Sequence, residues 1–290
     1  MRLRPARRDQ TGELLAFVRA HPVDPDWSVP LERLLGSLPT RDEAILDVEE
    51  GGERVAVAVL LDGLTNIDDV AMLELLGRRP ELPMERLIDF LKPMALELAT
   101  QAGKKGVDLY LNDQGGAIPA GATAVRGALV MRRPDAELPV LRAPRGLRWK
   151  SLEESDLLAY HRLVLAAFAD DPGMQVSPFD EFAKAVMKMP VRARLLCNLK
   201  GPVALARVSV NGDEGFIDSL GRHPDWRGRG LGPVVLGEAG RLLRSLGARH
   251  LKLGVTSSNR TARRLYEQNG FSTTESWTVW RWPIAPLSRA

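Results

Sequence analysis

The sequence predicts an α+β (α/β) protein in which helices flank a mixed, mostly antiparallel sheet, and it predicts that this arrangement occurs twice in tandem. Three observations support the prediction. Apolar runs with the period of a strand alternate with amphipathic helical segments over most of the 290 residues. A strand–helix–strand–helix stretch in the second half indicates a locally parallel strand pair. The chain also aligns with itself at a shift of about 144 residues, which indicates an internal repeat.

The self-alignment joins short segments that occur in the same order in both halves. Leu76 to Pro80 (LGRRP), for example, aligns with Leu220 to Pro224 (LGRHP). Proline and charged residues cluster between the halves, which is typical of a linker. We therefore predict two domains of one fold, residues 1–138 and residues 145–290. A chain of 290 residues is long enough for two domains of ordinary size.

The elements of the first half follow from periodicity and from turn residues. Gly51 and Gly52 lie between two apolar runs and predict the turn of a hairpin. Pro93 lies inside a long helical pattern, which it should kink because it removes one backbone hydrogen bond. The expected elements are a helix at 14–20, strands at 44–48, 55–61 and 69–76, and a helix at 84–102.

The second half repeats this order. Ser151 is expected to cap a helix, with Glu154 completing a capping box. Pro224 ends a strand, and Gly247 and Gly270 each end a helix. The expected elements are helices at 152–168, 232–246 and 259–269, and strands at 194–198, 203–210, 215–224 and 251–255.

The most informative local motif is the glycine-rich loop Arg227-Gly228-Arg229-Gly230-Leu231-Gly232, between an expected strand and an expected helix. Its glycines leave backbone N–H groups uncovered, and the following helix adds the positive end of its dipole. This combination is a cradle for phosphate or pyrophosphate. The loop lacks the Gly-Lys-Ser/Thr of a Walker A motif and the glycine spacing of a dinucleotide-binding fingerprint. An RGG-like nucleic-acid segment and a turn without a ligand are the alternatives at this point.

A second motif makes the function predicted for the loop more specific. Together the two motifs resemble the GCN5-related N-acetyltransferases, the GNAT superfamily. The acyl-CoA loop of that family, R/Q-x-x-G-x-G/A, is matched by Arg227, Gly230 and Gly232. A later signature, Asn-x-x-Ala-x-x-x-Tyr-x-x-x-Gly-Phe, is matched by Asn259, Ala262, Tyr266, Gly270 and Phe271. Because the repeat extends to the first half, the resemblance implies two GNAT folds in tandem.

The resemblance implies that acetyl-CoA is the cosubstrate and that its pantetheine arm pairs with the free edge of a splayed central strand. On this chain, main-chain groups of Leu220 and Arg222 would form that edge, with the Leu220 N–H near the acetyl oxygen. Asn259 resembles the family residue that contacts the pantetheine arm, and asparagine is also an ordinary helix N-cap. The pyrophosphate would bind the N–H groups of Arg227, Gly228, Arg229, Gly230, Leu231 and Gly232.

Acetyl transfer to an amine needs a proton donor for the leaving thiolate and a proton acceptor for the amine. Tyr266 matches the family tyrosine that lies near the CoA sulfur and acts as general acid. Asp218 is the candidate general base, since some family members have a carboxylate at this place that works through water. It lies two residues before Leu220, so on a regular strand both side chains face the same side. Purely structural roles, a packed tyrosine and an aspartate paired with an arginine, are the alternatives.

The first copy is expected to be a degenerate domain that does not bind CoA. At the shift of the repeat, the loop corresponds to residues 83–88, where every glycine is gone. Pro83 has no N–H group to offer, and Glu85 would repel a phosphate. This copy would instead cover apolar surface of the second copy or help to shape its acceptor pocket.

Composition restricts the remaining possibilities. The net charge of +3, spread along the chain, fits an anionic ligand such as CoA as well as it fits nucleic acid, so the charge decides little. Among the functions considered, nucleic-acid binding is the weakest interpretation. Cys197 is the single cysteine, which excludes an internal disulfide, and it is expected in the core. The four histidines lack metal-ligand spacing, so no metal is expected. No run of about 18 apolar residues occurs, so we expect a cytoplasmic protein without a membrane segment.

The acceptor is expected to be a small-molecule amine or a peptide amine. In the family, the first helices and the loop between them set acceptor choice, here about residues 167–178. Asp170 and Asp171 in this stretch attract a cationic amine or form a solvated helix end. Two other functions stay open: a mycothiol-synthase-like acetyltransferase, because those enzymes are tandem GNAT proteins, and a non-catalytic acyl-CoA-binding sensor. The sequence does not indicate an oligomeric state.

Overall fold

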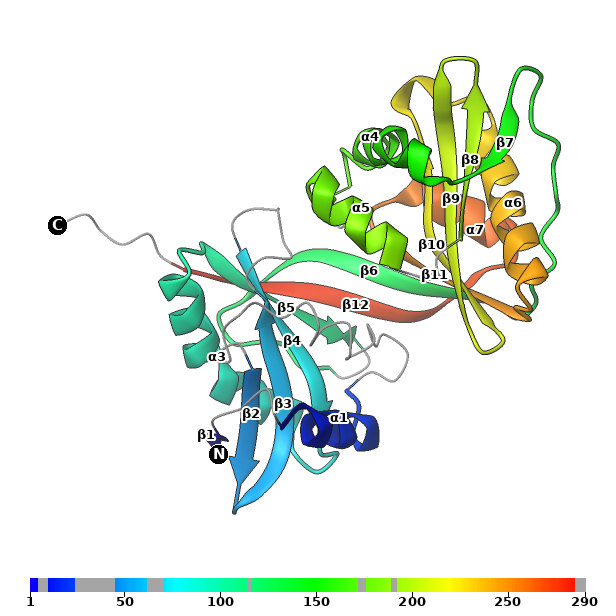
Figure 1. Cartoon of the computed structure of the whole chain (residues 1–290). Coiled ribbons are helices and arrows are strands. Elements are labelled where there is room, and N and C mark those ends of the chain that lie inside the picture. Colours follow the sequence, from blue (N-terminus) through cyan, green and yellow to red (C-terminus); the bar gives the residue numbers. More distant parts are fainter. Residues whose placement is uncertain are drawn as a thin grey trace. The chain divides into compact units, whose positions relative to one another are not determined.

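The computed structural model forms two compact units that do not follow the order of the chain. It describes residues 1–4, 10–23, 45–61, 70–113, 116–171, 176–188 and 192–284. The first unit comprises Met1–Arg126 and Trp277–Ala290, and the second comprises Gly127–Ser276 (Figure 1). The expected boundaries at 138 and 145 differ from these units because two long strands, β6 (Thr123–Arg133) and β12 (Ser272–Pro283), contribute residues to both.

The described residues of the first unit form a mixed sheet. Its order is β1-β2-β3-β4-β5, followed by residues 277–283 of β12, and the β4–β5 pair is parallel. The expected hairpin turn is confirmed, since Gly51 and Gly52 have φ of 63° and 88° between β2 and β3. Pro93 lies within α3, which continues on both sides of it. The elements are β1 (Arg2–Arg4), α1 (Thr11–Ala20), β2 (Ile45–Glu50), β3 (Glu53–Leu61), β4 (Val70–Arg78), α3 (Met84–Gln101) and β5 (Gly106–Asn112).

The second unit has a sheet of the order β6-β11-β10-β9-β8-β7, in which only the β10–β11 pair is parallel among the pairs described. Helices α4 and α5 cover one face of this sheet, and α6 and α7 cover the other (Figure 1). The elements are β7 (Arg148–Ser151), α4 (Leu157–Ala167), α5 (Phe179–Lys188), β8 (Arg192–Asn198), β9 (Gly201–Asn211), β10 (Glu214–Arg222), α6 (Leu231–Ser245), β11 (His250–Thr256) and α7 (Arg260–Gln268).

The repeat seen in the sequence is a repeat of structure. In the first unit β4 pairs in parallel with β5 from Val70↔Gly106 to Leu73↔Leu109. In the second unit β10 pairs in parallel with β11 from Glu214↔His250 to Ile217↔Leu253. Each residue in the second set lies 144 positions after its counterpart in the first, so the register of the central pair is the same in both copies. The tandem arrangement of one mixed fold is therefore confirmed.

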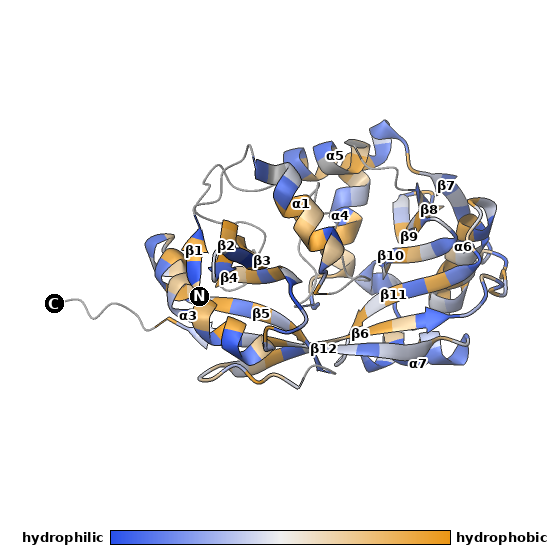
Figure 2. Cartoon of the chain, turned by 90° about the horizontal axis from the view of Figure 1, so that it is seen from below, coloured by the Kyte–Doolittle hydropathy of each residue, from blue (hydrophilic) through white to orange (hydrophobic). Residues whose placement is uncertain are grey.

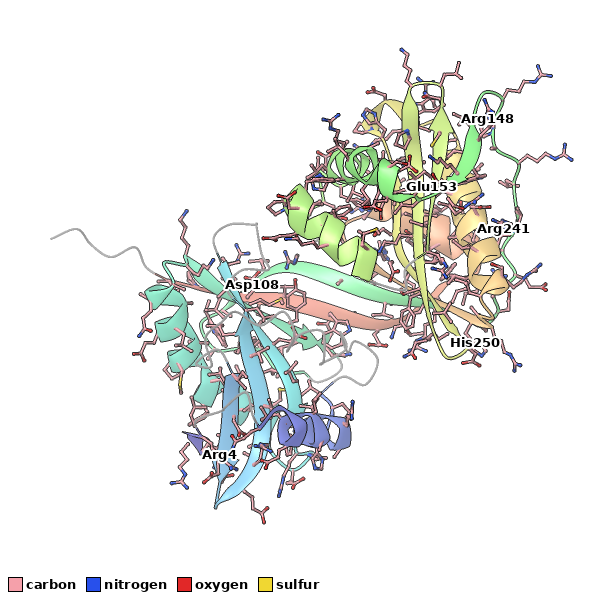
Figure 3. All side chains as sticks on the ribbon, viewed as in Figure 1. Arg4, Asp108, Arg148, Glu153, Arg241 and His250 are labelled. Atoms are coloured by element: carbon pink, nitrogen blue, oxygen red, sulfur yellow. The ribbon has the colours of Figure 1, made fainter. Side chains whose placement is uncertain are left out.

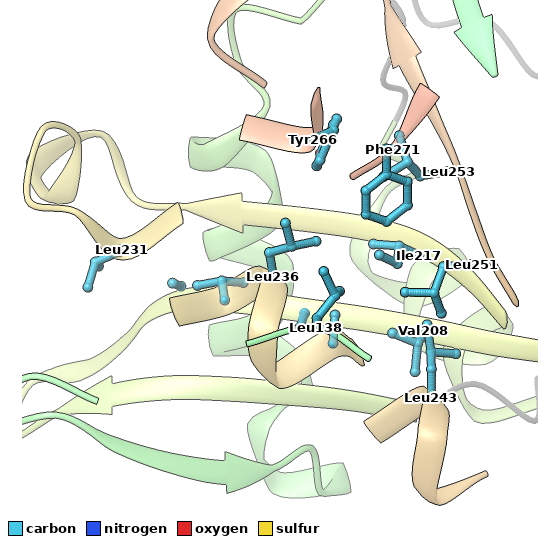
Figure 4. Packing of buried hydrophobic residues seen from close by; sticks show 14 of the residues in the cluster. Leu138, Val208, Ile217, Leu231, Leu236, Leu243, Leu251, Leu253, Tyr266 and Phe271 are labelled. Atoms are coloured by element: carbon cyan, nitrogen blue, oxygen red, sulfur yellow. The ribbon is translucent and has the colours of Figure 1, made fainter. Parts of the chain in front are cut away.

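The core of each unit lies between its sheet and its helices. Figure 2 shows apolar residues along the strands and on helix faces, alternating with polar ones. In the second unit, the cluster between the sheet and α6 and α7 contains Ile217, Leu236, Leu243 and Phe271 (Figure 4). In the first unit Trp282 is almost fully buried, and its Nε1 donates to the carbonyl oxygen of Ala120 at 3.2 Å. Half-buried Cys197 lies in β8, where burial raises the pKa of its thiol.

The expected cap at Ser151 is wrong. Ser151 pairs with Arg194 as the last residue of β7, and its Oγ accepts a hydrogen bond from Arg194 Nη1 at 2.8 Å. The capping box is formed two residues later by Glu153, labelled in Figure 3, and Asp156 around a 3-10 turn (Glu154–Asp156). The helix starts later than expected because Ser151 belongs to β7, which pairs with β8.

Two glycines in the middle of α6 are explained by the linker that follows β6. A Cβ on Gly237 would lie 2.2 Å from the carbonyl oxygen of Pro139, and one on Gly240 would lie 2.7 Å from Leu138 Cδ1. The linker therefore lies directly on the helix backbone. Helix propensity alone disfavours glycine at such positions by about 1 kcal/mol relative to alanine. The close packing of the linker, and not helix propensity, therefore explains why glycine occupies both positions.

We expect Gly237→Ala to destabilise the second unit by about 3 kcal/mol, because the linker must move to admit the methyl group. The free energy of unfolding from urea denaturation measures the effect. Gly12→Ala in α1 is the matched control, because a Cβ at Gly12 meets nothing within 4 Å and should not destabilise. Equal stability of Gly237→Ala and the wild type would contradict the close contact.

Candidate functional site

A cavity in the second unit has a volume of about 990 Å³ and lies where β10 and β11 end and where α6 and α7 begin. The turn after α4 forms another wall. The lining residues include most of those predicted from the sequence: Leu220, Arg222, Arg227, Gly228, Gly230, Leu231, Gly232, Asn259 and Tyr266. Two predicted site residues, Arg229 and Asp218, are not among those that line it.

The cavity exists because β10 and β11 separate. Their parallel pairing ends at Ile217↔Leu253, whereas β10 stays paired with β9 as far as Arg222. The N–H of His223 donates to Val203 O in the line of β9, at 2.8 Å. Because N–H groups alternate between the two edges of a strand, those of Arg222 and Leu220 point to the opposite, open edge. The main-chain groups singled out in the sequence therefore face the gap.

Local sequence shapes the loop between β10 and α6. Pro224 opens a 3-10 turn (Pro224–Trp226), and His223 Nδ1 accepts from the N–H of Asp225 at 3.3 Å. Gly228 and Gly230 have φ of 75° and 70°, a conformation that glycine adopts without strain. Gly230 is the N-cap of α6, so the first N–H groups of this 15-residue helix lack intrahelical partners and point outward with the dipole. This end of the cavity is built to receive an anion.

The loop arginines have different neighbours. Arg227 Nη1 donates to Asp170 Oδ2 at 2.9 Å, which connects the loop to the turn after α4. The Arg229 guanidinium lies over the ring of Trp226, 4.8 Å from its centroid. Of the three arginines predicted for the site, Arg222 and Arg227 therefore line the cavity and Arg229 does not.

Tyr266 lies in α7 with only 8 % of its surface exposed, and its ring contacts that of Phe271. Burial raises the pKa of the phenol to about 12; the charge of Arg222 lowers it and that of Asp171 raises it. The hydroxyl is consequently protonated at any physiological pH and can act as a proton donor.

Asn259 caps the helix that carries Tyr266. Its Oδ1 accepts from the N–H of Ala262 at 3.1 Å, which confirms the expected N-cap. The helix ends at Gln268, and Gly270 beyond it has φ of 80°. The second sequence motif therefore builds α7 and holds Tyr266 in the wall of the cavity.

Asp218 does not face the side that regular alternation predicts. Ile217 pairs with Val208 and Ser219 with Arg207, so Asp218 is the extra residue of a β-bulge. Its Oδ1 accepts from Ser209 Oγ at 3.0 Å, and Arg207 Nε lies 3.9 Å from its Oδ2. A bulge shifts the alternation by one residue, so the expected shared face with Leu220 is wrong. The role of Asp218 as general base stays a prediction.

Sequence reasoning missed several residues of the cavity. Arg260 and Arg264 come from the first turns of α7, one helical turn apart, and both line the cavity. Their i, i+4 spacing was the available signal. Thr256, the last residue of β11, also lines it, and no local pattern marks this residue.

The loop of the first unit differs from that of the second. Arg78, which aligns with Arg222, donates to the carbonyl oxygens of Arg79 and Pro80 at 3.2 Å, and also to that of Leu82. In this part of the first unit, backbone carbonyl oxygens therefore surround the Arg78 guanidinium, whereas the loop of the second unit has outward-pointing N–H groups. This arrangement does not favour an anion.

The described part of the chain lacks a metal-binding cluster and a membrane-spanning helix. No group of three or more His, Cys, Asp or Glu residues there is arranged to hold a metal ion. None of the helices in those residues has the length and apolar character needed to cross a bilayer.

Comparisons with known proteins agree with this geometry. The Acetyltransferase (GNAT) family matches residues 165–271. A mycothiol acetyltransferase of Thermobispora bispora is 31 % identical over 206 residues, which cover 63 % of this chain and 67 % of that protein. An uncharacterized N-acetyltransferase of Bacillus subtilis, YycN, is 42 % identical over 62 residues, and the chain spans only 40 % of its length. A tandem GNAT protein from the clavulanic acid biosynthesis pathway has a similar fold, with a TM-score of 0.70 at 17 % identity over 97 % of this chain and 96 % of that one.

Proposed function

Since this chain belongs to the GNAT family and is an acyltransferase, we propose that it transfers an acetyl group from acetyl-CoA to a primary amine. One observation supports the proposal above the others. A single cavity combines the open edge of β10, the N-terminus of α6 behind a glycine-rich loop, and a buried, protonated Tyr266. These are the parts that a thioester, its pyrophosphate and its leaving thiolate require.

In this proposal each part of the cavity has one task. The pyrophosphate binds the N–H groups from Arg227 to Gly232, and the pantetheine arm follows the open edge at Leu220 and Arg222, near Asn259. The Leu220 N–H donates to the acetyl oxygen as it gains charge. The neutral amine nitrogen bonds to the carbonyl carbon and gives up one proton, by way of water, to a base. The carbon–sulfur bond breaks, the thiolate takes the proton of Tyr266, and the tyrosinate regains a proton from solvent. A base at Asp218 would act through water, because its carboxylate lies against Ser209.

We propose that only the second unit binds acetyl-CoA. Isothermal titration should therefore give one site per chain, and saturating acetyl-CoA should raise Tm, because a ligand present at 100 times its Kd stabilises the folded state by about 2.7 kcal/mol. A chain that shows no rise in Tm contradicts the cofactor proposal, and two sites per chain contradict the proposal for the first unit.

The acceptor can be found by following the release of free thiol across a panel of amines. Binding of acetyl-CoA without thiol release from any amine would indicate a different acceptor class. The mycothiol acetyltransferase of Thermobispora bispora supports a second candidate, an acceptor like that of this relative, because the similarity extends over 206 residues. The acceptor of that enzyme therefore belongs in the panel.

A further inference from the structure

We infer that Arg260 and Arg264 bind the 3′-phosphate on the ribose of CoA, so that the enzyme distinguishes CoA thioesters from dephospho-CoA thioesters. The inference rests on the proposed function and specifies how the same cavity holds the adenosine end of the cosubstrate. It starts from two arginines of the cavity wall that lie outside the glycine-rich loop, and from a phosphate that this loop leaves without a partner.

Arg260 and Arg264 lie on one side of α7, one helical turn apart. Both residues are exposed and both line the cavity, as does Gln268 a further turn along. Because Tyr266 on the same helix is buried, the two arginines belong to the outer part of the cavity, away from the proposed site of acyl transfer. Among the residues that the structure describes, neither arginine forms an ion pair, so both guanidinium groups can receive an anion.

The other charged residues that line the cavity lie elsewhere in it. Both carboxylates in the described lining, Asp170 and Asp171, come from the turn after α4, whereas the charged lining residues of α7 are both arginines. Arg227 donates to Asp170 at 2.9 Å. Arg222 lies toward the start of α6, since its Nη1 would be 4.0 Å from a Cβ on Gly232. The α7 side of the cavity is therefore its most cationic part that has no carboxylate beside it.

This side of α7 lies next to the proposed pyrophosphate site, because the helix packs against the first turn of α6. A Cβ on Gly232 would lie 3.2 Å from Leu265 Cδ2. The residue that follows Arg264 therefore contacts the last glycine of the loop. A ligand whose pyrophosphate binds the N–H groups of the loop consequently has the arginines of α7 beside it.

The chemistry of CoA supplies an anion for this position. CoA has three phosphates, and the loop has N–H groups for the two of the pyrophosphate. The third is a monoester on the ribose, with a charge of about −1.5 to −2 near pH 7. Arginine binds such a group through charge-assisted and often bidentate hydrogen bonds. Because the ribose lies beyond the pyrophosphate as seen from the thioester, its phosphate fits the outer part of the cavity, where both arginines lie.

Acetyl-dephospho-CoA, which lacks only this phosphate, tests the inference by isothermal titration. The wild type should bind acetyl-CoA about 5- to 20-fold more tightly, the lower part of the range for hydrogen bonds to charged groups, because both side chains are exposed. This preference should shrink when salt is added. In the double variant Arg260→Gln, Arg264→Gln it should fall to within about twofold, through weaker binding of acetyl-CoA alone.

The matched control is the double variant Arg148→Gln, Arg162→Gln. It removes the same amount of charge from exposed positions in β7 and α4 that do not line the cavity. It should keep the preference of the wild type for acetyl-CoA, which separates a local contact from a change in overall charge. Urea denaturation shows whether each variant is folded.

Equal affinities of the wild type for the two ligands would overturn the inference, and this measurement needs no variant. Equal losses for both ligands in the Arg260→Gln, Arg264→Gln protein would also overturn it, since the arginines would then act on a part that the ligands share. So would unchanged affinities for both ligands together with a higher KM for an anionic acceptor. Failure of the proposed function looks different, because wild-type protein would then bind neither ligand.

Discussion

Tyr266→Phe is expected to lower kcat by about 10²- to 10⁴-fold, the usual contribution of a positioned proton donor. Phenylalanine keeps the ring that contacts Phe271 and removes only the hydroxyl, so the core should retain its packing. The Kd for acetyl-CoA should change by less than about twofold, because the loss falls on the transition state and not on binding. Steady-state kinetics and isothermal titration on the same preparations measure both quantities.

The pH profile provides an independent check on this role. A general acid is active in its protonated form, so its contribution is lost only as pH rises through its pKa. Burial raises the pKa of Tyr266 to about 12. Ionisation of this phenol should therefore produce no fall in kcat below about pH 10. Tyr110→Phe in the first unit is the matched control and should leave kcat unchanged. An equal kcat for Tyr266→Phe and the wild type would show that the thiolate obtains its proton elsewhere.

Gly230→Asp is expected to weaken acetyl-CoA binding by about 30- to 1000-fold while the fold is retained. Gly230 is the N-cap of α6 with φ of 70°. Aspartate is a preferred N-cap and tolerates the left-handed conformation better than most residues. Its negative charge would lie where the pyrophosphate is proposed to bind, and like charges about 4 Å apart near a protein surface repel by about 2–4 kcal/mol.

Gly230→Asn is the matched control, because it has the same shape and conformational preference without the charge. Because it lacks the repulsion, it should bind acetyl-CoA about 30- to 1000-fold more tightly than Gly230→Asp, and this gap should narrow at high salt. Isothermal titration gives the affinities, and urea denaturation confirms that both variants are folded. Equal affinities for the two variants would show that no phosphate lies at this position.

The sequence predicted most of the local structure, because local structure depends on neighbours in the chain. The hairpin turn at Gly51 and Gly52, the cap at Asn259 and the loop around Gly230 follow from residue types with strong backbone preferences. The internal repeat could also be predicted from the sequence, because the register of the central strand pair is the same in both copies. The predicted cap at Ser151 was wrong because the partner of this residue, Arg194, lies 43 residues away in the sequence, so local patterns do not indicate the contact.

By itself, then, the sequence determined that the chain has two copies of one mixed fold and that the second copy has the glycine-rich loop, which the corresponding residues 83–88 of the first lack. Tertiary structure decided three further points. A β-bulge turned Asp218 away from the face of Leu220, the turn after α4 brought Asp171 to Thr256, and β6 and β12 contributed residues to both units. Each depends on contacts between segments far apart in the chain, and the periodicity of one segment does not show which distant segment it contacts.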